Sequence, residues 1–148
     1  MSADPAYLGA HSPRLKAARR LTKRTFRQRE RAFLAEGPQA VAEAIGSGAR
    51  ITDLFVTAPA RGRHAGLVAA VASTGVPVHV VSGEVMDELA QTVTPQGLLA
   101  VCGFVDVPLA AVAAQAPRLV VLLANVRDPG NAGTVLRTAD AAGAQAVV

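Results

Sequence analysis

Residues 125–143, NVRDPGNAGTVLRTADAAG, concentrate the groups of this chain that could do chemistry. The segment holds two Asn, two Arg and two Asp together with one Pro and three Gly, and it follows the apolar run RLVVLLA. Amide, carboxylate and guanidinium groups hydrogen-bond polar ligands and pair with charges. Open α/β sheets build their sites at the carboxyl ends of parallel strands. The loop after this apolar run is therefore the candidate site.

The first half of the segment predicts a tight bend that leads into a helix. Pro129 fixes its own backbone and keeps Asp128 out of helical geometry, and Gly130 allows a sharp turn. Asn131 is expected to be the N-cap of a helix over 132–142. Asp128 then lies where the positive end of that helix favours a carboxylate.

The second half predicts a guanidinium directed back toward the bend. Long helical side chains lean toward the N-terminus, so Arg137 is expected to lie over Gly133, whose missing side chain leaves room. Two alternatives remain open: Asn131 serves only as a cap, or Arg137 pairs with Asp140 or Asp128 at the surface. Neither a P-loop nor a dinucleotide-binding glycine pattern occurs in the sequence.

The elements around this loop alternate between strand and helix, which is typical of an α/β fold. Ser12 and Pro13 predict the start of a basic helix that runs on toward residue 33. Gly143 is expected to end the helix of the candidate site. The expected strands are 33–37, 51–57, 76–82, 97–105, 118–126 and 144–148, and the other expected helices are 37–48, 64–75 and 83–91.

These elements group into domains. An α/β domain is expected over 31–105, after a basic helix or arm over 1–30, and residues 106–117 are expected to be a linker with some helical character. Residues 118–148 begin a second unit with an apolar strand of the kind that parallel sheets cover on both faces. This unit is shorter than the roughly 40 residues that usually fold unaided. We therefore expect the chain to be part of a longer protein, or a shortened relative that borrows cover from another chain.

The net positive charge of the chain is concentrated at its N-terminal end. Residues 1–31 hold nine Lys or Arg against two acids, a net charge of +7, whereas the remainder has a net charge of −3. Such a segment suits a phosphate-rich partner. A solvated helical face or a disordered tail would have the same composition, and Tyr7, Phe26 and Phe33 are too scattered to form a base-stacking platform.

The composition also narrows the class of protein. No uncharged stretch is unbroken enough to span a bilayer, and no apolar block follows the N-terminal charges, so neither a membrane segment nor a secretory signal is expected. The single Cys102 is expected to be a buried small residue, and a cytoplasmic location follows as the default. His11, His64 and His79 lack metal-ligand spacing, so no metal is expected.

The combination of loop residues resembles the first signature motif of the SpoU (TrmH) family of RNA ribose 2′-O-methyltransferases, in the SPOUT superfamily. The match covers Asp-Pro-x-Asn-x-Gly, the downstream Arg-Thr-Ala and the later Gly. Upstream, FLAEGPQAVAEAI and VMDELAQTVTPQGLLAV are similar to the family's substrate-binding domain, which is like ribosomal protein L30e. The implied fold class is α/β: an L30e-like α/β/α sandwich followed by the first part of a SPOUT parallel-sheet domain, whose complete form is a trefoil knot.

The resemblance implies transfer of a methyl group from S-adenosylmethionine to a ribose 2′-hydroxyl of ribosomal or transfer RNA, usually by a homodimer. Asn131 and Arg137 match the family's catalytic positions. A guanidinium stays protonated, so Arg137 is expected to hold the phosphate beside the target ribose and to stabilise the developing alkoxide, while Asn131 orients the hydroxyl or holds the loop. Asp128, Pro129, Gly130 and Gly133 set the loop geometry. The residues expected to contact RNA are Arg14, Lys16, Arg19, Arg20, Lys23, Arg24, Arg27, Glu36, Gly37 and Arg127.

A hypothesis of a different class is an L30e-like RNA-binding module without catalysis. The loop at 125–143 discriminates between the two hypotheses, because a pure RNA-binding module has no use for a catalytic motif.

The resemblance also predicts how residues 1–148 behave alone. The family's second and third motifs, whose loops hold the methyl donor, would lie after Val148, so these 148 residues are expected neither to bind S-adenosylmethionine nor to methylate RNA. Isothermal titration calorimetry with S-adenosylmethionine measures this directly. Micromolar donor binding would contradict the prediction.

Overall fold

The computed structural model describes residues 7–148, and the chain divides into two compact units, Met1–Val105 and Asp106–Val148. Residues 1–6 of the predicted basic arm lie outside the described part. Each unit is taken by itself below.

Unit 1 is built on a mixed four-stranded sheet with the strand order β1-β4-β2-β3. β4 is antiparallel to both of its neighbours, whereas β2 and β3 are parallel. The pairing of β2 with β4 shifts register between Ile51 and Asp53, which is a local irregularity in the ladder. All four strands lie where the sequence predicts them: β1 (Ala32–Glu36), β2 (Ile51–Thr57), β3 (Val78–Val81) and β4 (Leu98–Gly103).

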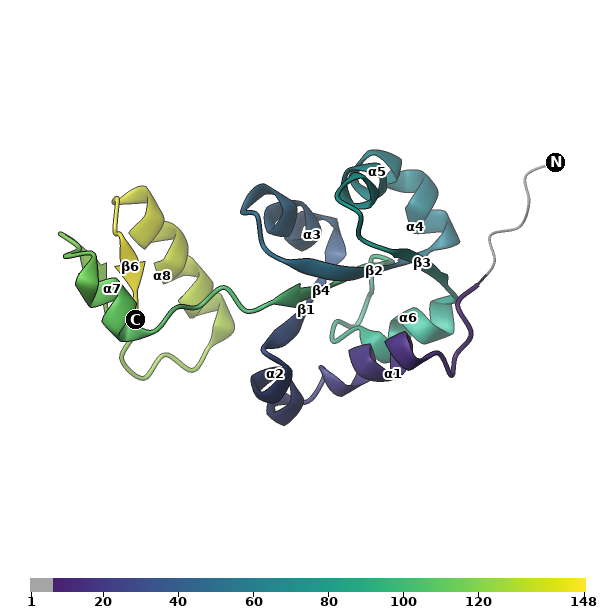
Figure 1. Ribbon diagram of the computed structural model, residues 1–148, viewed down its shortest axis with the longest axis horizontal. Helices are drawn as coiled ribbons and strands as arrows, with labels where there is room; N and C mark the ends of the chain where they lie inside the picture. The colour runs from purple at the N-terminus through teal and green to yellow at the C-terminus, as the bar shows by residue number, and fades with distance from the viewer. Residues whose placement is uncertain (1–6) are drawn as a thin grey trace. The chain divides into compact units, whose positions relative to one another are not determined.

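Helices cover both faces of this sheet, so the predicted α/β class is confirmed (Figure 1). α3 (Gly37–Gly46), α4 (Ala58–Arg63) and α5 (Ala65–Ser73) lie on one face. α1 (Pro13–Arg20) and α6 (Gly83–Leu89) lie on the other, and α2 (Arg24–Glu30) precedes β1. The short α4 is not among the elements that the sequence predicts. Within residues 7–148, no helix is long and apolar enough to cross a bilayer.

Two hydrophobic clusters hold the helices to the sheet, and β4 contributes to both. Ala100 and Cys102 belong to the cluster on the α3–α5 face, whereas Leu99 belongs to the cluster on the α1–α6 face. Leu15 and Ala18 of α1 are buried in the second cluster. The basic segment therefore shares a core with the sheet.

The prediction of a single basic helix over this segment is wrong, although its start is confirmed. Ser12 caps α1 by accepting from the Arg14 N–H at 3.3 Å, with Pro13 at the first helical position. α1 ends at Arg20 and α2 begins at Arg24. The Arg27 guanidinium donates to the carbonyls of Leu21 and Thr22 at 3.0 and 2.8 Å. Since terminal helix carbonyls lack intrahelical partners, these bonds stabilise the break.

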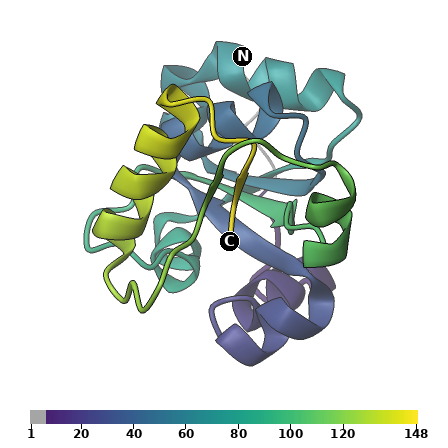
Figure 2. The same ribbon diagram turned by 90° about the vertical axis from the view of Figure 1, so that its left-hand side faces the viewer.

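Unit 2 contains α7 (Leu109–Ala114), β5 (Val120–Val121), α8 (Pro129–Ala141) and β6 (Ala146–Val147) (Figure 2). β5 and β6 pair in parallel. The predicted strand over 118–126 is therefore too long. In the described chain, β5 pairs only with β6, and the ladder joins Val120 and Val121 to Ala146 and Val147. Leu122 lies beyond this ladder and is 72% exposed.

The predicted end of α8 is confirmed in detail. Gly143 has φ +75°, and its N–H donates to the Asp140 carbonyl while the Ala144 N–H donates to the Ala139 carbonyl, both at 2.9 Å. These two bonds form a Schellman motif, in which a glycine commonly occupies the left-handed position.

Two left-handed glycines of unit 1 allow backbone strain to be separated from steric overlap. At Gly97 (φ +78°), an added Cβ would lie 2.5 Å from Thr57 Oγ1 and 2.8 Å from the Ala60 Cβ; at Gly48 (φ +68°), it would meet nothing within 4 Å. We expect Gly48→Ala to lower the free energy of unfolding by about 1 kcal/mol through backbone strain alone. Gly97→Ala should lower the free energy of unfolding by about 1–3 kcal/mol more than Gly48→Ala, because the added methyl group would overpack the core between β4 and α4. Urea unfolding at constant m-value measures both, and equal losses would contradict the packing argument.

Candidate functional site

The bend that follows β5 is held by a helix cap. α8 begins at Pro129, with Asp128 as its N-cap, and the Asp128 carboxylate accepts from the Asn131 N–H at 2.8 Å. The predictions that Asn131 is the N-cap and that the helix starts at residue 132 are therefore wrong. Proline is pre-organised for the first helical position, and the carboxylate before it has both the geometry and the charge of a cap.

Gly130 fits this bend because of the capping carboxylate. A Cβ at Gly130 would lie 3.0 Å from Asp128 Oδ1, tighter than ordinary contact. A side chain there would push against the atom that accepts from the Asn131 N–H. The bend from Asp128 to Asn131 thus depends on a carboxylate, a proline and a bare glycine in sequence.

Arg137 folds back along α8 toward this bend. A Cβ built on Gly133 would lie 3.3 Å from Arg137 Nη1, so the guanidinium lies against the bare glycine, as the sequence predicts. Arg137 Nη2 donates to Thr134 Oγ1 at 3.3 Å, and Thr134 Oγ1 donates to the Gly130 carbonyl at 3.0 Å. Thr134, which the sequence analysis did not single out, therefore links the guanidinium to the bend.

The surface pairing of Arg137 with an acidic neighbour is not found. In the part of the chain that the structure describes, no ion pair joins Arg137 to Asp128 or Asp140, and no hydrogen bond joins it to Asn131. Arg137 and Asn131 are both exposed, as is Arg127 in the loop. A guanidinium that is held in place by Thr134 but not neutralised can bind an anion.

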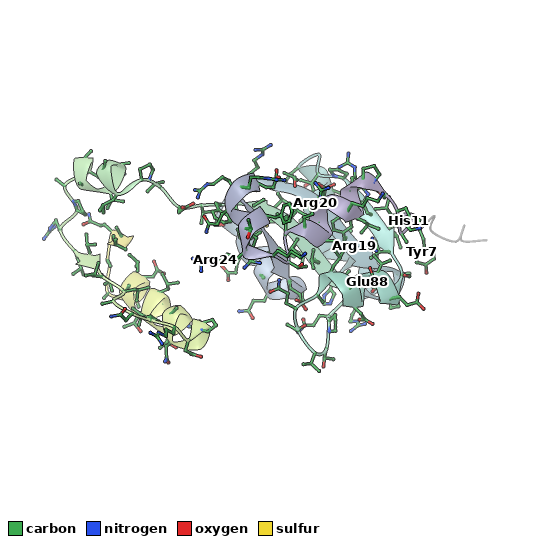
Figure 3. All side chains as sticks on the ribbon, turned by 90° about the horizontal axis from the view of Figure 1, so that it is seen from below. Tyr7, His11, Arg19, Arg20, Arg24 and Glu88 are labelled. Carbon is green, nitrogen blue, oxygen red and sulfur yellow. The ribbon has the colours of Figure 1, made fainter. Side chains whose placement is uncertain are left out.

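The basic residues of α1 and α2 do not form one uniform surface. Arg14 pairs with Asp53. Arg19 pairs with Glu88 of α6 (Figure 3). Arg19 also donates to the Ala10 carbonyl. Arg27 is engaged in the break between the helices. Of the predicted cations on this segment, the side chains of Lys16, Lys23 and Arg24 make no hydrogen bond or ion pair within residues 7–148, and the guanidinium carbon of Arg20 lies 5.7 Å from the Phe26 ring centroid.

Glu36 and Gly37 lie at the opposite end of β1 from Ala32, where β1 passes into α3. The Glu36 carboxylate accepts from the Gln91 N–H at 3.0 Å and from Thr92 Oγ1. Gly37 has φ +88°, and a Cβ there would lie 3.5 Å from Gln96 Oε1. The structure thus gives Glu36 and Gly37 a shared structural task, which is to hold the segment between α6 and β4 against the end of the sheet.

The thiol and imidazole groups do not form a reactive centre in the described residues. Cys102 is fully buried, as predicted, and burial raises the pKa of its thiol to about 11. His79 Nε2 lies 2.9 Å from Asp53 Oδ1, beside the Arg14 pair. Residues 7–148 contain no group of three or more His, Cys, Asp or Glu side chains that could hold a metal ion.

Comparison with known proteins adds to this geometry. Residues 12–100 match the family model of the MRM3-like substrate binding domain. The chain is 33% identical over 139 residues to the 23S rRNA (guanosine(2553)-2′-O)-methyltransferase RlmP of Bacillus subtilis, an alignment that covers 94% of this chain and 52% of that protein.

Solved structures show the same fold. The AdoMet-bound rRNA methyltransferase from Sinorhizobium meliloti superposes with a TM-score of 0.74 at 30% identity, covering 97% of this chain and 53% of that chain. The AdoMet complex of the SpoU methyltransferase AviRb from Streptomyces viridochromogenes superposes with a TM-score of 0.73 at 22% identity. This match covers 93% of this chain and 52% of that chain. This chain thus spans about half the length of the proteins it matches.

The cap of α8 can be tested without any activity. Asp128→Ala removes the acceptor of the Asn131 N–H, and the loss of such a cap costs about 1 kcal/mol. We expect the first turn of α8 to fray, which hydrogen exchange measured by NMR would detect as faster exchange at the Asn131 amide.

Asp140→Ala is the matched control, because it removes the same charge from an exposed position of α8 whose side chain makes no hydrogen bond or ion pair in the described chain. Its effect on the Asn131 amide should be negligible. Similar acceleration in both variants would assign the effect to charge and not to the cap.

Proposed function

The chain belongs to the family of MRM3-like substrate-binding domains, and we propose that it serves in an RNA ribose 2′-O-methyltransferase that uses S-adenosylmethionine. Unit 1 recognises the RNA, and the loop of unit 2 acts on the ribose. We propose ribosomal RNA as the substrate, because the named relatives modify it. The observation that carries the proposal is the guanidinium of Arg137, held over Gly133 and free of any acidic partner in unit 2.

Arg137 supplies charge and geometry, not a base. A guanidinium remains protonated in proteins, so it does not remove the proton of the 2′-hydroxyl. Its planar fork holds the phosphate next to the target ribose and stabilises negative charge that develops on the 2′-oxygen during methyl transfer. Asn131, about one and a half turns earlier on α8, orients the hydroxyl with its amide.

The residues present do not fit the methyl donor itself. S-Adenosylmethionine supplies the electrophilic methyl group. The polar groups at the bend are the Asp128 carboxylate, which the helix cap already uses, and the exposed Asn131 and Arg137, which suit a hydroxyl and a phosphate. We therefore assign donor binding to no residue of this chain.

The domain organisation forms part of the proposal. Residues 1–30 are taken as a basic segment, of which α1 packs on the sheet, residues 31–105 as an L30e-like substrate-binding domain, residues 106–117 as a linker, and residues 118–148 as the start of the methyltransferase domain. The cations on α1 and α2, with Arg127, contact the phosphates. Glu36 and Gly37 shape a further RNA contact at the end of the sheet where β1 passes into α3. We propose a cytoplasmic homodimer that needs no metal.

Replacement of the fork by a point charge tests the role of Arg137. In a polypeptide that joins these 148 residues to a complete methyltransferase domain, Arg137→Lys keeps the charge but loses bidentate geometry. We expect kcat to fall about 100-fold, as when one donor to a developing oxyanion is removed. Transfer of radiolabelled methyl groups from S-adenosylmethionine to RNA measures the rate.

Arg118→Lys is the control, since Arg118 is exposed at the start of unit 2 and its guanidinium makes no hydrogen bond or ion pair in the described chain. Its rate should match that of the parent. Undiminished methylation by Arg137→Lys would remove the fork from the mechanism. RNA binding without methylation by the parent protein would favour the non-catalytic RNA-binding module.

A further inference from the structure

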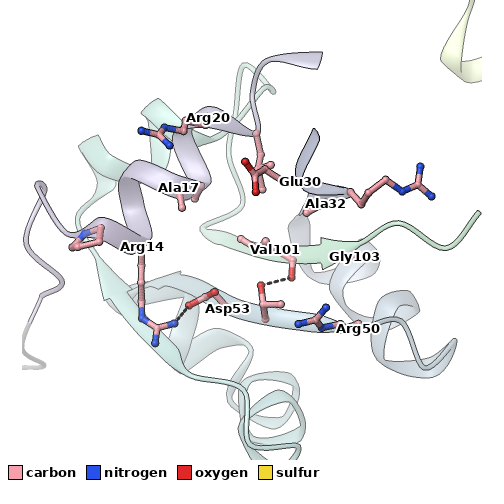
Figure 4. Close-up of a pocket in the computed structure, with 14 residues that line it drawn as sticks. Arg14, Ala17, Arg20, Glu30, Ala32, Arg50, Asp53, Val101 and Gly103 are labelled. Atoms are coloured by element: carbon pink, nitrogen blue, oxygen red, sulfur yellow. Dashed lines mark hydrogen bonds and ion pairs between the residues drawn. The ribbon is translucent and has the colours of Figure 1, made fainter. Parts of the chain in front are cut away.

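A cavity of about 600 Å³, which we call the Arg50 cleft, opens on the α1 side of the unit 1 sheet (Figure 4). It lies at the end of the sheet where β1 begins with Ala32 and β4 ends with Gly103. Glu36 is at the other end of β1, about 13 Å away for a strand of this length. The cleft is therefore separate from the end of the sheet that Glu36 and Gly37 shape.

The cleft exists because helices cover only part of this sheet face. The cluster under α1 and α6 centres on Phe55, Leu99 and Leu15. Beyond it, the lining residues are small: Ala17 on α1, Ala32 on β1 and Gly103 on β4, with Val101 between them. The register shift between Ile51 and Asp53 lies in the same wall, and such irregularities often occur next to sites. Together these residues leave a weakly polar floor with little side-chain bulk.

Arginines from three separate segments surround this floor: Arg14 and Arg20 of α1, Arg31 after α2, and Arg50 before β2. The two acids in the lining are already engaged. Asp53 accepts from Arg14 and lies beside His79, and Glu30 pairs with Arg29 outside the cleft. Arg20 and Arg50 make no ion pair within residues 7–148, so the rim carries uncompensated positive charge.

A small apolar floor with a cationic rim matches a nucleotide, which has a flat base and an anionic phosphate. Its volume lies within the roughly 300–1,000 Å³ of small-molecule sites. Arginine binds phosphate through its planar fork, and the unstacked bases of single-stranded RNA stack on aromatic side chains or on guanidinium planes, of which this cleft offers the latter.

We propose that the Arg50 cleft binds one unpaired nucleotide of the substrate RNA, with the base against Ala17, Val101 and Gly103 and the phosphate at Arg50. This inference rests on the proposed function, since it takes RNA as the ligand. It adds a specific place on unit 1 that receives RNA, in addition to the general positive charge of α1 and α2.

Two variants test the two halves of this site in the 148-residue chain, with fluorescein-labelled pentauridylate as the probe. Arg50→Ala removes the phosphate contact, and we expect affinity to fall about tenfold, as for a lost charge-assisted hydrogen bond. The slope of log K against log salt concentration should also fall by about 0.7, the value for one phosphate contact on a single strand. Ala17→Phe leaves the charge unchanged and fills the floor, so affinity should fall while the salt slope stays constant.

Each variant has a matched control on the opposite face of the sheet. Arg63→Ala removes an exposed arginine from the end of α4, and Ala70→Phe adds the same bulk to an exposed position of α5. Neither should weaken binding. Fluorescence anisotropy gives the affinities, and thermal unfolding confirms that every variant is folded.

NMR titration of the same chain separates failure of the cleft from failure of the proposed function. Amide shifts at Ala17, Ala32 and Gly103 on addition of pentauridylate support the cleft. RNA binding with shifts confined to other surfaces, or equal losses in Arg50→Ala and Arg63→Ala, would overturn the cleft but leave RNA recognition by unit 1 intact. No binding of either pentauridylate or a folded ribosomal RNA hairpin would overturn both.

Discussion

The burial of β4 on both of its faces is the constraint on which unit 1 depends. Leu98, Leu99, Ala100 and Cys102 are all fully buried, and consecutive strand residues point to opposite faces. The strand therefore needs helical cover on both sides, which α3–α5 and α1–α6 supply. Cover on the α1 side requires Leu15 and Ala18, so the most cationic part of the chain must lie on the sheet. The position of the basic residues is thus a consequence of core packing.

Unit 2 obeys a different rule, because its geometry is encoded locally. Few of its side chains are buried, and its ladder joins two residues from each strand. The bend is nevertheless defined by the Asp128 cap, the Gly130 clearance and the Thr134 hydroxyl, and α8 ends in a Schellman motif at Gly143. All of these contacts lie within a few residues in sequence. A loop built this way can keep its shape with little tertiary packing around it.

This difference explains what the sequence could and could not predict. Strands of unit 1, the Ser12 cap, the Gly143 stop and the position of Arg137 over Gly133 follow from periodicity and local stereochemistry, and all are found. Asn131 was predicted to be the cap because Pro129 and Gly130 were expected to form a bend before the helix. Asp128 takes that place because Pro129 suits the first helical position, which makes the residue before it the N-cap. The break between α1 and α2 depends on Arg27 reaching two carbonyls, which no sequence period reports.

The partners of the cations could not be predicted either, and they change what the positive charge means. Net charge counts every arginine equally. Arg14 and Arg19, however, are paired with Asp53 and Glu88, which lie far away in sequence. A cation that is already paired with a carboxylate neutralises a phosphate less, so it displaces fewer of the cations condensed on a nucleic acid and adds little to the salt dependence of binding. In the proposed complex with RNA, Arg50, which has no acidic partner within residues 7–148, contributes more to affinity than the paired Arg19. The free positive charge of unit 1 is therefore set by which guanidinium groups the fold leaves unpaired, not by where the sequence concentrates them.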